Sequence, residues 1–528
     1  MNGEVEPGPV AGGVAVGRAA ILIAALSTTA KVAGFLRDRT LAVSFGVGSE
    51  CDAYIVASWL PGLMVTMMTA AIAAALLPVF TGLRVGGDEA RAWRVSSSIL
   101  NMTVIVSGIL AVAGMVWAGP VARMAAPGFS ASTAGLTASL LRITLPSTVF
   151  IGVFSVASAV LHSYRRFAPP AAGPILVNAA TIVSVVVLGP RIGVASAAYG
   201  LLAGYALQAV ALLLFLPRAP RSYTPTLGLR DPGTIQVLRL AVPVVAYSAF
   251  SQASGLIEKY IASGLEAGSV SALAFANKLV LLPVGLFSVA VSTAMFPGMA
   301  EAAGREDYRY LRETIEKGMR MLAYMTIPAA AGLMYLRHPI VSALFERGAF
   351  DAGATAMTAS AVLWYSAGML FQSVQPILER AFNASRDTLT PSAAGVARIV
   401  LYTALAVPLS RYMGHQGIAL TMSVTSALTC MSLGVVLCRR LEAEVRWRDV
   451  AWFLLRVSAG CGVMTAAAAG ALRLVTPVLG GRLAPVLASV GLGAAAYFCV
   501  TALLRVEEAV HIVRLVESRV RRRRSGKA

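Results

Sequence analysis

Residues 31–78 read KVAGFLRDRTLAVSFGVGSECDAYIVASWLPGLMVTMMTAAIAAALLP, and they place a few charges inside a long apolar background. Two apolar segments flank a short glycine-containing connection, and the charges are Lys31, Arg37, Asp38, Arg39 and Asp52. An ionisable side chain at membrane depth costs roughly 2.5–3.5 kcal/mol on insertion scales, so it persists mostly where it faces water, a partner or a ligand. These charges therefore mark a candidate functional site.

The composition of the whole chain indicates a polytopic membrane protein. Of its 528 residues, 57% are hydrophobic and 13% are charged, which is about half the charged share of a soluble protein. Residues 1–16 carry Glu4 and Glu6 but no base, so no cleaved signal is expected. The net charge of +19 is attributed to the positive-inside rule, and no nucleic-acid partner is expected.

Apolar runs predict about 14 transmembrane helices, because a helix needs about 20 apolar residues to cross the hydrocarbon core. The fold class is therefore an all-α polytopic membrane protein. Prolines such as Pro61, Pro146 and Pro376 fall inside spans, which a membrane bundle tolerates where neighbours satisfy the freed carbonyls. The expected spans lie near 14–37, 52–80, 96–118, 134–161, 168–188, 194–216, 234–262, 267–297, 318–336, 354–382, 389–409, 415–438, 450–475 and 484–504.

Alternate loops carry most of the arginine and lysine, and this asymmetry predicts the orientation. The basic loops include Arg165 and Arg166, the stretch 439–448 and the C-terminal tail. By the positive-inside rule these loops are cytoplasmic, and an even number of spans puts both termini on that side. The tail run at 519–524 is interpreted as a topological anchor, with specific lipid recognition as the alternative.

Two stretches about 220 residues apart share a pattern that predicts an internal repeat. Residues 34–61 and 255–283 each contain a charged pair, a glycine turn (Gly46; Gly268) and a proline-interrupted span (Pro61; Pro283). We expect an N-lobe of spans 1–6 (14–216), a C-lobe of spans 7–12 (234–438), appended spans 13 and 14 (450–504) and a basic cytoplasmic tail (505–528). Such repeats place the substrate site at the lobe interface, with alternating access.

Signatures of enzymes and metal sites do not occur in the sequence. There is no P-loop, HExxH or GxSxG motif, no two of the five cysteines form a CxxC, and the four histidines are scattered. These patterns predict a protein that is not an enzyme, with no catalytic residue, no metal and no ATP-driven transport.

Cations outnumber acids among the charges set into the apolar spans, so a cavity lined by them favours an anionic ligand. Arginine binds phosphate bidentately, and lysine binds it as a point charge. Lys31 and Lys278 have no acid within a helical turn in sequence, which makes them the better ligand candidates. The alternative for Arg37–Asp38 and Glu258–Lys259 is that each pair joins its own members and binds nothing.

Short motifs spread over nearly the whole chain resemble those of one family, the MurJ (MviN) lipid II flippases of the multidrug/oligosaccharidyl-lipid/polysaccharide exporter superfamily. The motifs are collinear with the family's. They are Gly34–Asp38, Phe45–Gly48, Asp52–Tyr54, Pro127–Phe129, Gly268–Ser271, Ala276–Leu279, Leu344–Phe350, Arg380–Phe382, Arg386–Thr388 and Thr390–Pro391.

The resemblance implies a V-shaped two-lobe transporter in the bacterial inner membrane. Such a transporter moves lipid II, an undecaprenyl-diphosphate-linked peptidoglycan precursor, from the cytoplasmic to the outer leaflet. The resemblance also implies that a cation gradient or the membrane potential drives transport and that no cofactor is used. Spans 13 and 14 would form a groove for the polyprenyl tail. Besides the lipid-linked saccharide, membrane lipids and cell-wall synthesis proteins are the expected partners.

The resemblance also implies roles for individual residues. Carried over position by position, the diphosphate-binding cations fall on Lys31, Arg37 and Lys278. The supporting positions are those of the charged groups nearby, namely Asp38, Asp52, Glu258 and Lys259.

One stretch departs from the family's pattern. Between Pro61 and Arg84 this chain has no charged residue, although the family usually has an arginine in that stretch. In addition, Lys31 and Lys278 stand at positions where the family usually has arginine. Lysine keeps the charge but loses the bidentate fork. Three alternatives follow: an exporter of another polyprenyl-diphosphate-linked oligosaccharide, a cation-coupled multidrug antiporter, which predicts an acid-rich aromatic cavity, and a non-transporting scaffold for cell-wall assembly.

Overall fold

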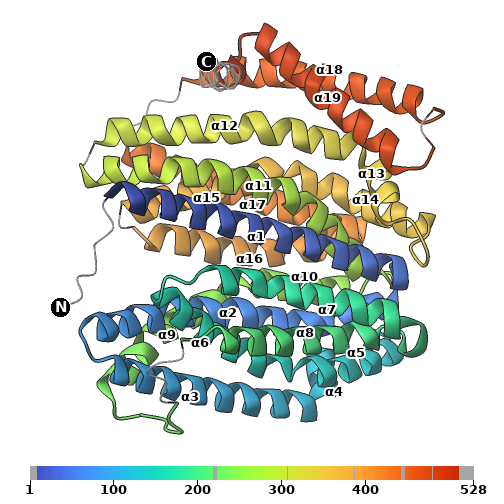
Figure 1. Ribbon diagram of the computed structural model, residues 1–528. Coiled ribbons are helices and arrows are strands. Elements are labelled where there is room, and N and C mark those ends of the chain that lie inside the picture. Colours follow the sequence, from blue (N-terminus) through green and yellow to red (C-terminus); the bar gives the residue numbers. More distant parts are fainter. Residues whose placement is uncertain are drawn as a thin grey trace, which may run out of the picture. The chain divides into compact units, whose positions relative to one another are not determined.

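The computed structural model describes residues 9–217, 223–305, 307–385, 387–441, 446–478 and 480–510, and the regular structure in these ranges is α-helical (Figure 1). The basic run at 519–524 lies outside these described residues. The helices are α1 Pro9–Phe45, α2 Ser49–Val85, α3 Glu89–Val116, α4 Ala118–Ala125, α5 Ala131–Thr144, α6 Ser147–Ser163, α7 Ala168–Ile192, α8 Ala195–Leu214, α9 Pro232–Ser251, α10 Ala253–Ala262, α11 Ser269–Gly304, α12 Tyr308–Tyr335, α13 Arg337–Phe345, α14 Ala352–Ala367, α15 Met369–Ala384, α16 Leu389–Met413, α17 His415–Arg440, α18 Trp447–Val475 and α19 Leu483–Leu503.

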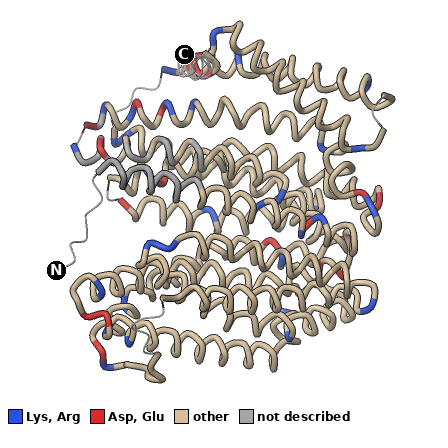
Figure 2. Tube along the Cα trace, viewed as in Figure 1, with Lys and Arg blue, Asp and Glu red and all other residues tan. Residues whose placement is uncertain are grey.

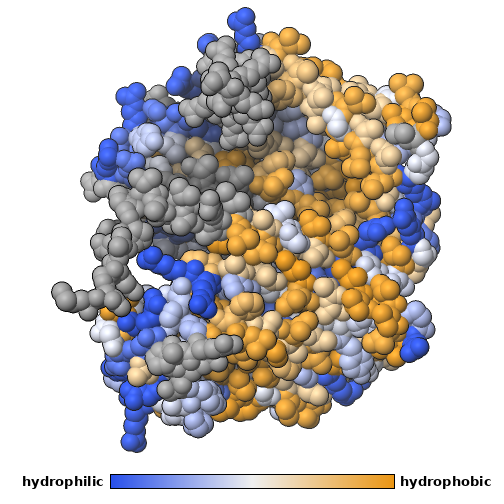
Figure 3. All heavy atoms as spheres, viewed as in Figure 1, coloured by the Kyte–Doolittle hydropathy of each residue, from blue (hydrophilic) through white to orange (hydrophobic). Residues whose placement is uncertain are grey.

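Each expected span coincides with one helix or with two helices in succession. Among the described residues, 11 helices are long and apolar enough to cross a membrane, or 12 if the bent pair α14–α15 counts as one span. The helices α1 and α12 correspond to the two remaining expected spans. Charged residues lie mainly near helix ends (Figure 2), and apolar side chains cover much of the visible helix surface (Figure 3). The predicted fold class is confirmed.

Three expected spans are broken in the middle. The fourth divides into α5 and α6 at Leu145 and Pro146, and the seventh divides into α9 and α10 at Gln252. The tenth bends by 44° between α14 and α15 at Gly368. A Cβ on Gly368 would lie 2.5 Å from the Cα of Ser423, so only glycine fits where α17 crosses this bend.

Hydroxyl groups from neighbouring helices satisfy carbonyls that prolines inside helices leave without a helical donor. In α2, Pro61 has no N–H for the carbonyl of Ala57, and Thr144 Oγ1 donates to that carbonyl at 3.2 Å. In α12, Pro328 frees the carbonyl of Tyr324 in the same way, and Tyr497 Oη donates to it at 2.8 Å. The prolines are therefore tolerated because the bundle replaces the missing bonds, as expected for membrane helices.

The chain divides into two compact units, residues 1–271 and 272–528. In unit 1, α7 packs on α1 and α8, and α2 packs on α6 and α9. A Cβ on Gly200 would lie 2.7 Å from the Cα of Thr181, and one on Gly204 would lie 2.7 Å from the Cα of Val177. The backbones of α7 and α8 therefore touch, as small residues allow in membrane bundles.

In unit 2, the hairpin of α18 and α19 packs against α12. Buried side chains from all three helices form one core there, among them Tyr324, Phe453, Met464 and Tyr497. A second core joins α12, α15 and α17 through residues such as Leu322, Phe382 and Leu433. The appended spans thus share a core with α12.

The expected boundaries between an N-lobe, a C-lobe and the appended spans stay a prediction. The helices of the expected seventh span, α9 and α10, belong to unit 1. The glycine turns of the expected repeat are similar in one respect, because Gly46 and Gly268 both have positive φ, at 64° and 95°.

Candidate functional site

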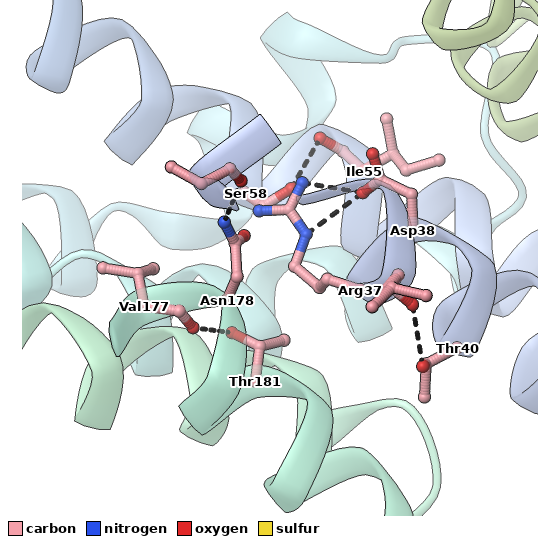
Figure 4. A network of polar contacts seen from close by, with 10 residues as sticks. Arg37, Asp38, Thr40, Ile55, Ser58, Val177, Asn178 and Thr181 are labelled. Carbon is pink, nitrogen blue, oxygen red and sulfur yellow. Dashed lines mark hydrogen bonds and ion pairs between the residues drawn. The ribbon is translucent and has the colours of Figure 1, made fainter. Parts of the chain in front are cut away.

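The charged neighbours in α1 form an ion pair. Nε and Nη2 of Arg37 donate to Oδ1 of Asp38 at 3.0 and 2.7 Å, and Figure 4 shows the guanidinium turned toward that carboxylate. The two side chains are 21% and 10% exposed. The guanidinium has five N–H donors and these contacts occupy two of them, so Arg37 keeps donors for a phosphate while Asp38 orients it.

Lys31 lies on an exposed part of the same helix. It precedes Arg37 by six residues, which is about 9 Å along the helix axis. Asn178 of α7 positions this part of α1, because its Nδ2 donates to the carbonyl of Ala30 at 3.3 Å. A Cβ on Gly34 would stand 3.5 Å from the same amide nitrogen. The exposed lysine and the ion pair thus lie on the same helix, which Asn178 holds against α7, but they point about 120° apart around its axis.

Asp52 is buried and caps the turn before α11. Its Oδ2 accepts from the N–H of Gly268 and its Oδ1 accepts from the N–H of Ser271, both at 2.7 Å. The side chain is 2% exposed. A carboxylate at a helix N-terminus satisfies donors that have no helical partner. Asp52 therefore positions backbone, and it does not present its charge to a ligand.

Lys259 of α10 contacts α2, the helix whose first turn contains Asp52. Its Nζ lies 5.6 Å from the ring centroid of Trp59 in α2 and donates to the carbonyl of Gly255 at 3.2 Å. Glu258 precedes it on α10, and both side chains are half-buried. The cation–π contact places a positive charge of α10 beside α2, on the turn just before the uncharged stretch that follows Pro61.

Lys278 lies in unit 2, on α11, and its side chain is exposed. The structure pairs Arg37 with Asp38 on α1, places Lys31 about 9 Å away along the same helix, and joins α10 to α2 through Lys259. A common cavity for Lys31, Arg37 and Lys278 stays a prediction.

Unit 2 contains an apolar cavity of about 440 Å³ that residue patterns alone do not reveal. Its walls come from α11, α12, α18 and α19, and they include Phe287, Pro328, Met464, Ala468 and Phe498. Tyr324 and Tyr497 also line it, and their hydroxyls bond to Thr501 and to the Tyr324 carbonyl at 2.8 Å each. The resemblance implies a tail groove at spans 13 and 14, and the cavity lies at these helices.

Ion pairs hold the α18–α19 hairpin to the rest of unit 2. Before the hairpin's second helix, Arg482 Nη1 lies 3.1 Å from Glu346 Oε1. Hydrogen bonds from Ser342 and then from Thr355, together with the charge of Arg482, hold the pKa of Glu346 below its ordinary value. After α19, Arg320 of α12 pairs with Glu508 at 2.7 Å. These partners are more than 100 residues apart, so sequence spacing carries no signal for them.

Two of the family-like motifs build turns. Within Leu344–Phe350, Phe345 and Phe350 are buried and pack against Phe275 with ring centroids 5.6 and 6.1 Å away. In the turn before α16, Asp387 accepts from the N–H of Thr390 at 3.0 Å and pairs with Arg440 at 2.5 Å. These residues shape connections between helices, and the part of the chain that the structure describes contains no cluster of metal-ligating side chains.

Comparison with known proteins gives a consistent family. Residues 41–487 match the family described as lipid II flippase MurJ. A probable lipid II flippase MurJ of Vibrio cholerae is 26% identical over 508 residues, covering 93% of this chain and 96% of the relative. Its counterpart in Thermotoga maritima is 31% identical over 396 residues, covering 75% and 80%.

A solved structure of lipid II flippase MurJ in an inward closed conformation has the same fold. It superposes with a TM-score of 0.78 at 23% identity and covers 92% of this chain and 98% of its own. The family match extends over most of the chain, and the helices, turns and cavity described above lie within or beside it. This multi-pass membrane protein therefore belongs to the lipid II flippase MurJ family.

Proposed function

We propose that this protein flips lipid II from the cytoplasmic to the outer leaflet of the bacterial inner membrane by alternating access. The observation that carries the proposal is the match to relatives named lipid II flippases along almost the entire length of both chains. Both termini lie in the cytoplasm. Transport draws on a cation gradient or the membrane potential and uses no cofactor.

Arg37, Lys31 and Lys278 bind the diphosphate. Arg37 is 21% exposed and held by Asp38, so its geometry is set before the ligand arrives. Lys31 and Lys278 have exposed side chains that can move to a phosphate as point charges. Lys259, beside Trp59, adds a further positive charge next to α2. Glu258 and Asp52 act in support, the latter by holding the turn before α11.

The polyprenyl tail occupies the apolar cavity of unit 2. The cavity's volume of about 440 Å³ lies within the usual range for ligand sites, and such sites bind chiefly through apolar walls. Burial of a prenyl chain in this cavity removes the chain's apolar surface from water, which is favourable. The cavity thus supports a substrate with a long hydrocarbon part, which a water-soluble drug lacks.

Complementation tests the proposal. We expect the wild-type chain to restore growth to a strain depleted of its own lipid II flippase, and Lys278→Ala to fail while remaining inserted. Lys317→Ala, which removes an exposed lysine from α12, is the matched control and should restore growth.

Arg37→Ala needs a companion variant, because it leaves the buried Asp38 carboxylate without its partner. The double variant Arg37→Ala/Asp38→Ala removes both charges, and we expect it to fail as well. If both Arg37 variants and Lys278→Ala restore growth fully, the phosphate-binding assignment is wrong. If the wild type restores export of another lipid-linked oligosaccharide but not of lipid II, the cargo is that oligosaccharide.

A further inference from the structure

A charged cavity lies in unit 2 where α12, the beginning of α18 and the segment after α19 meet. Its volume is about 320 Å³, and it shares no lining residue with the apolar cavity. The residues that line it are mostly arginine, aromatic or acidic, and they include Arg320, Trp452, Phe453, Arg456, Arg505 and Glu507. No role described so far uses this cavity.

The acidic residues of the cavity are already paired. Glu507 lies 3.2 Å from Nη2 of Arg320, whose Nε donates to Glu508 at 2.7 Å. Asp449, which also lines the cavity, pairs with Arg446 at 3.6 Å. The carboxylates are thus compensated by arginines other than the two described next.

Arg456 and Arg505 differ from Arg320 in their partners. Among the residues that the structure describes, neither has an acidic partner within ion-pair distance. The Arg456 guanidinium lies 5.9 Å from the ring centroid of Trp452, a contact that orients the side chain and leaves its edge donors open. Two oriented or exposed guanidinium groups beside one cavity are suited to bind a phosphate.

Arg505 stands at a backbone position at the end of α19 where glycine is the usual residue. The N–H of Val506 bonds to the carbonyl of Thr501, and that of Arg505 bonds to the carbonyl of Ala502. This is a Schellman end of α19, in which the position of Arg505 is usually glycine. Arg505 adopts φ 52° there, in the left-handed region. Glycine would relieve the backbone but would lose the charge.

The surroundings of the cavity are those of a membrane interface. Trp447 and Trp452 are 74% and 54% exposed, and tryptophans of this kind concentrate at the level of lipid headgroups. Leu455 and Leu504, which directly precede Arg456 and Arg505 in sequence, are exposed apolar residues. A ligand with a phosphate and two hydrocarbon chains fits both features.

We propose that the cavity between Arg456, Trp452 and Arg505 binds the headgroup of an anionic phospholipid of the surrounding bilayer. The phosphodiester contacts the two arginines, and the acyl chains lie along the exposed apolar residues of α18 and α19. Basic pockets at helix ends bind lipid headgroups in this manner. The proposal does not depend on which lipid the protein transports.

Arg505→Gly is the sharpest test, because it removes the charge and keeps a residue suited to the turn. Arg165→Gly is the matched control: Arg165 stands at the same position of a Schellman end after α6, with φ 58°. The full chain in non-ionic detergent is titrated with dioctanoyl phosphatidylglycerol, and the apparent affinity is read from the rise in melting temperature. Dioctanoyl phosphatidylcholine and inorganic phosphate are titrated in parallel.

We expect Arg505→Gly and Arg456→Gln each to weaken phosphatidylglycerol binding by about tenfold, the effect of one charge-assisted contact. Arg165→Gly should bind as the wild type does. The proposal is wrong if both cavity variants bind phosphatidylglycerol normally, or if phosphatidylcholine stabilises the protein equally. Stabilisation by inorganic phosphate as strong as by phosphatidylglycerol overturns the assignment to a lipid. Arg456→Gln keeps the test decisive if Arg505→Gly does not fold.

Discussion

Removal of the Asp52 carboxylate should destabilise the protein more than loss of an ordinary helix cap. The two N–H groups of Gly268 and Ser271 that donate to it, at 2.7 Å each, are buried, and such groups at a helix start have no intrahelical acceptor. Hydrogen bonds to a charged group contribute about 1.5–3 kcal/mol each. The energy of desolvating the carboxylate offsets part of that sum, so Asp52→Ala should lower the free energy of unfolding by about 2–4 kcal/mol.

Unfolding in detergent, followed by circular dichroism as denaturant is added, measures this difference. Asp88→Ala is the control, because Asp88 is an exposed N-cap whose Oδ1 accepts only from the N–H of Arg91 at 3.0 Å, and its loss should reduce stability by about 0.5–1 kcal/mol. Asp52→Asn keeps one acceptor oxygen, so its loss of stability should lie between those of Asp52→Ala and Asp88→Ala. If Asp52→Ala is no less stable than Asp88→Ala, the buried carboxylate does not hold the turn before α11.

Three further predictions concern other parts of the chain. The pKa of Glu346 is held below its ordinary value of 4.5, so its carboxylate stabilises the folded state above that pH, and this gain disappears as pH falls through the folded pKa. Wild type should melt higher than Glu346→Gln at pH 7, and the gap should narrow as the pH is lowered below 4.5. A Cβ on Gly128 would lie 2.3 Å from the Cα of Gly264, so Gly128→Ala should reduce stability by about 1–3 kcal/mol, whereas Gly135→Ala, which meets nothing within 4 Å, should be neutral or stabilising in the same thermal assay. Tyr497→Phe removes the donor to the Tyr324 carbonyl and should reduce stability by about 1–2 kcal/mol; an unchanged melting temperature would contradict the role given to that hydroxyl.

Hydropathy alone predicts the helical spans of this fold, because burial in lipid demands long apolar segments whatever their neighbours are. It also predicts that prolines such as Pro61 are tolerated inside spans. It cannot predict which group replaces a missing hydrogen bond, since Thr144 lies 87 residues from the Ala57 carbonyl that it serves. Nor does it distinguish a straight span from the bend at Gly368, which depends on how closely α17 approaches.

The candidate site was predicted less completely than the fold. The sequence offers the pairing of Arg37 with Asp38 as one alternative, and the structure contains this ion pair. The burial of Asp52 does not follow from any local pattern, because its partners Gly268 and Ser271 are more than 200 residues away. The charged cavity beside Arg505 is hidden in sequence for the same reason: its lining comes from three separate segments.

The hydrogen bond from Tyr497 to the Tyr324 carbonyl sets an order of events during biosynthesis. The two residues are 173 positions apart, and a ribosome adding about 5–20 residues per second needs roughly 10–35 s to cover that distance. Throughout this interval α12 is present without the Tyr497 hydroxyl that serves its Pro328-freed carbonyl in the folded protein, and α19 supplies that donor. The final helix therefore finishes a span made much earlier, and chains that end before α19 should be substrates for membrane quality control.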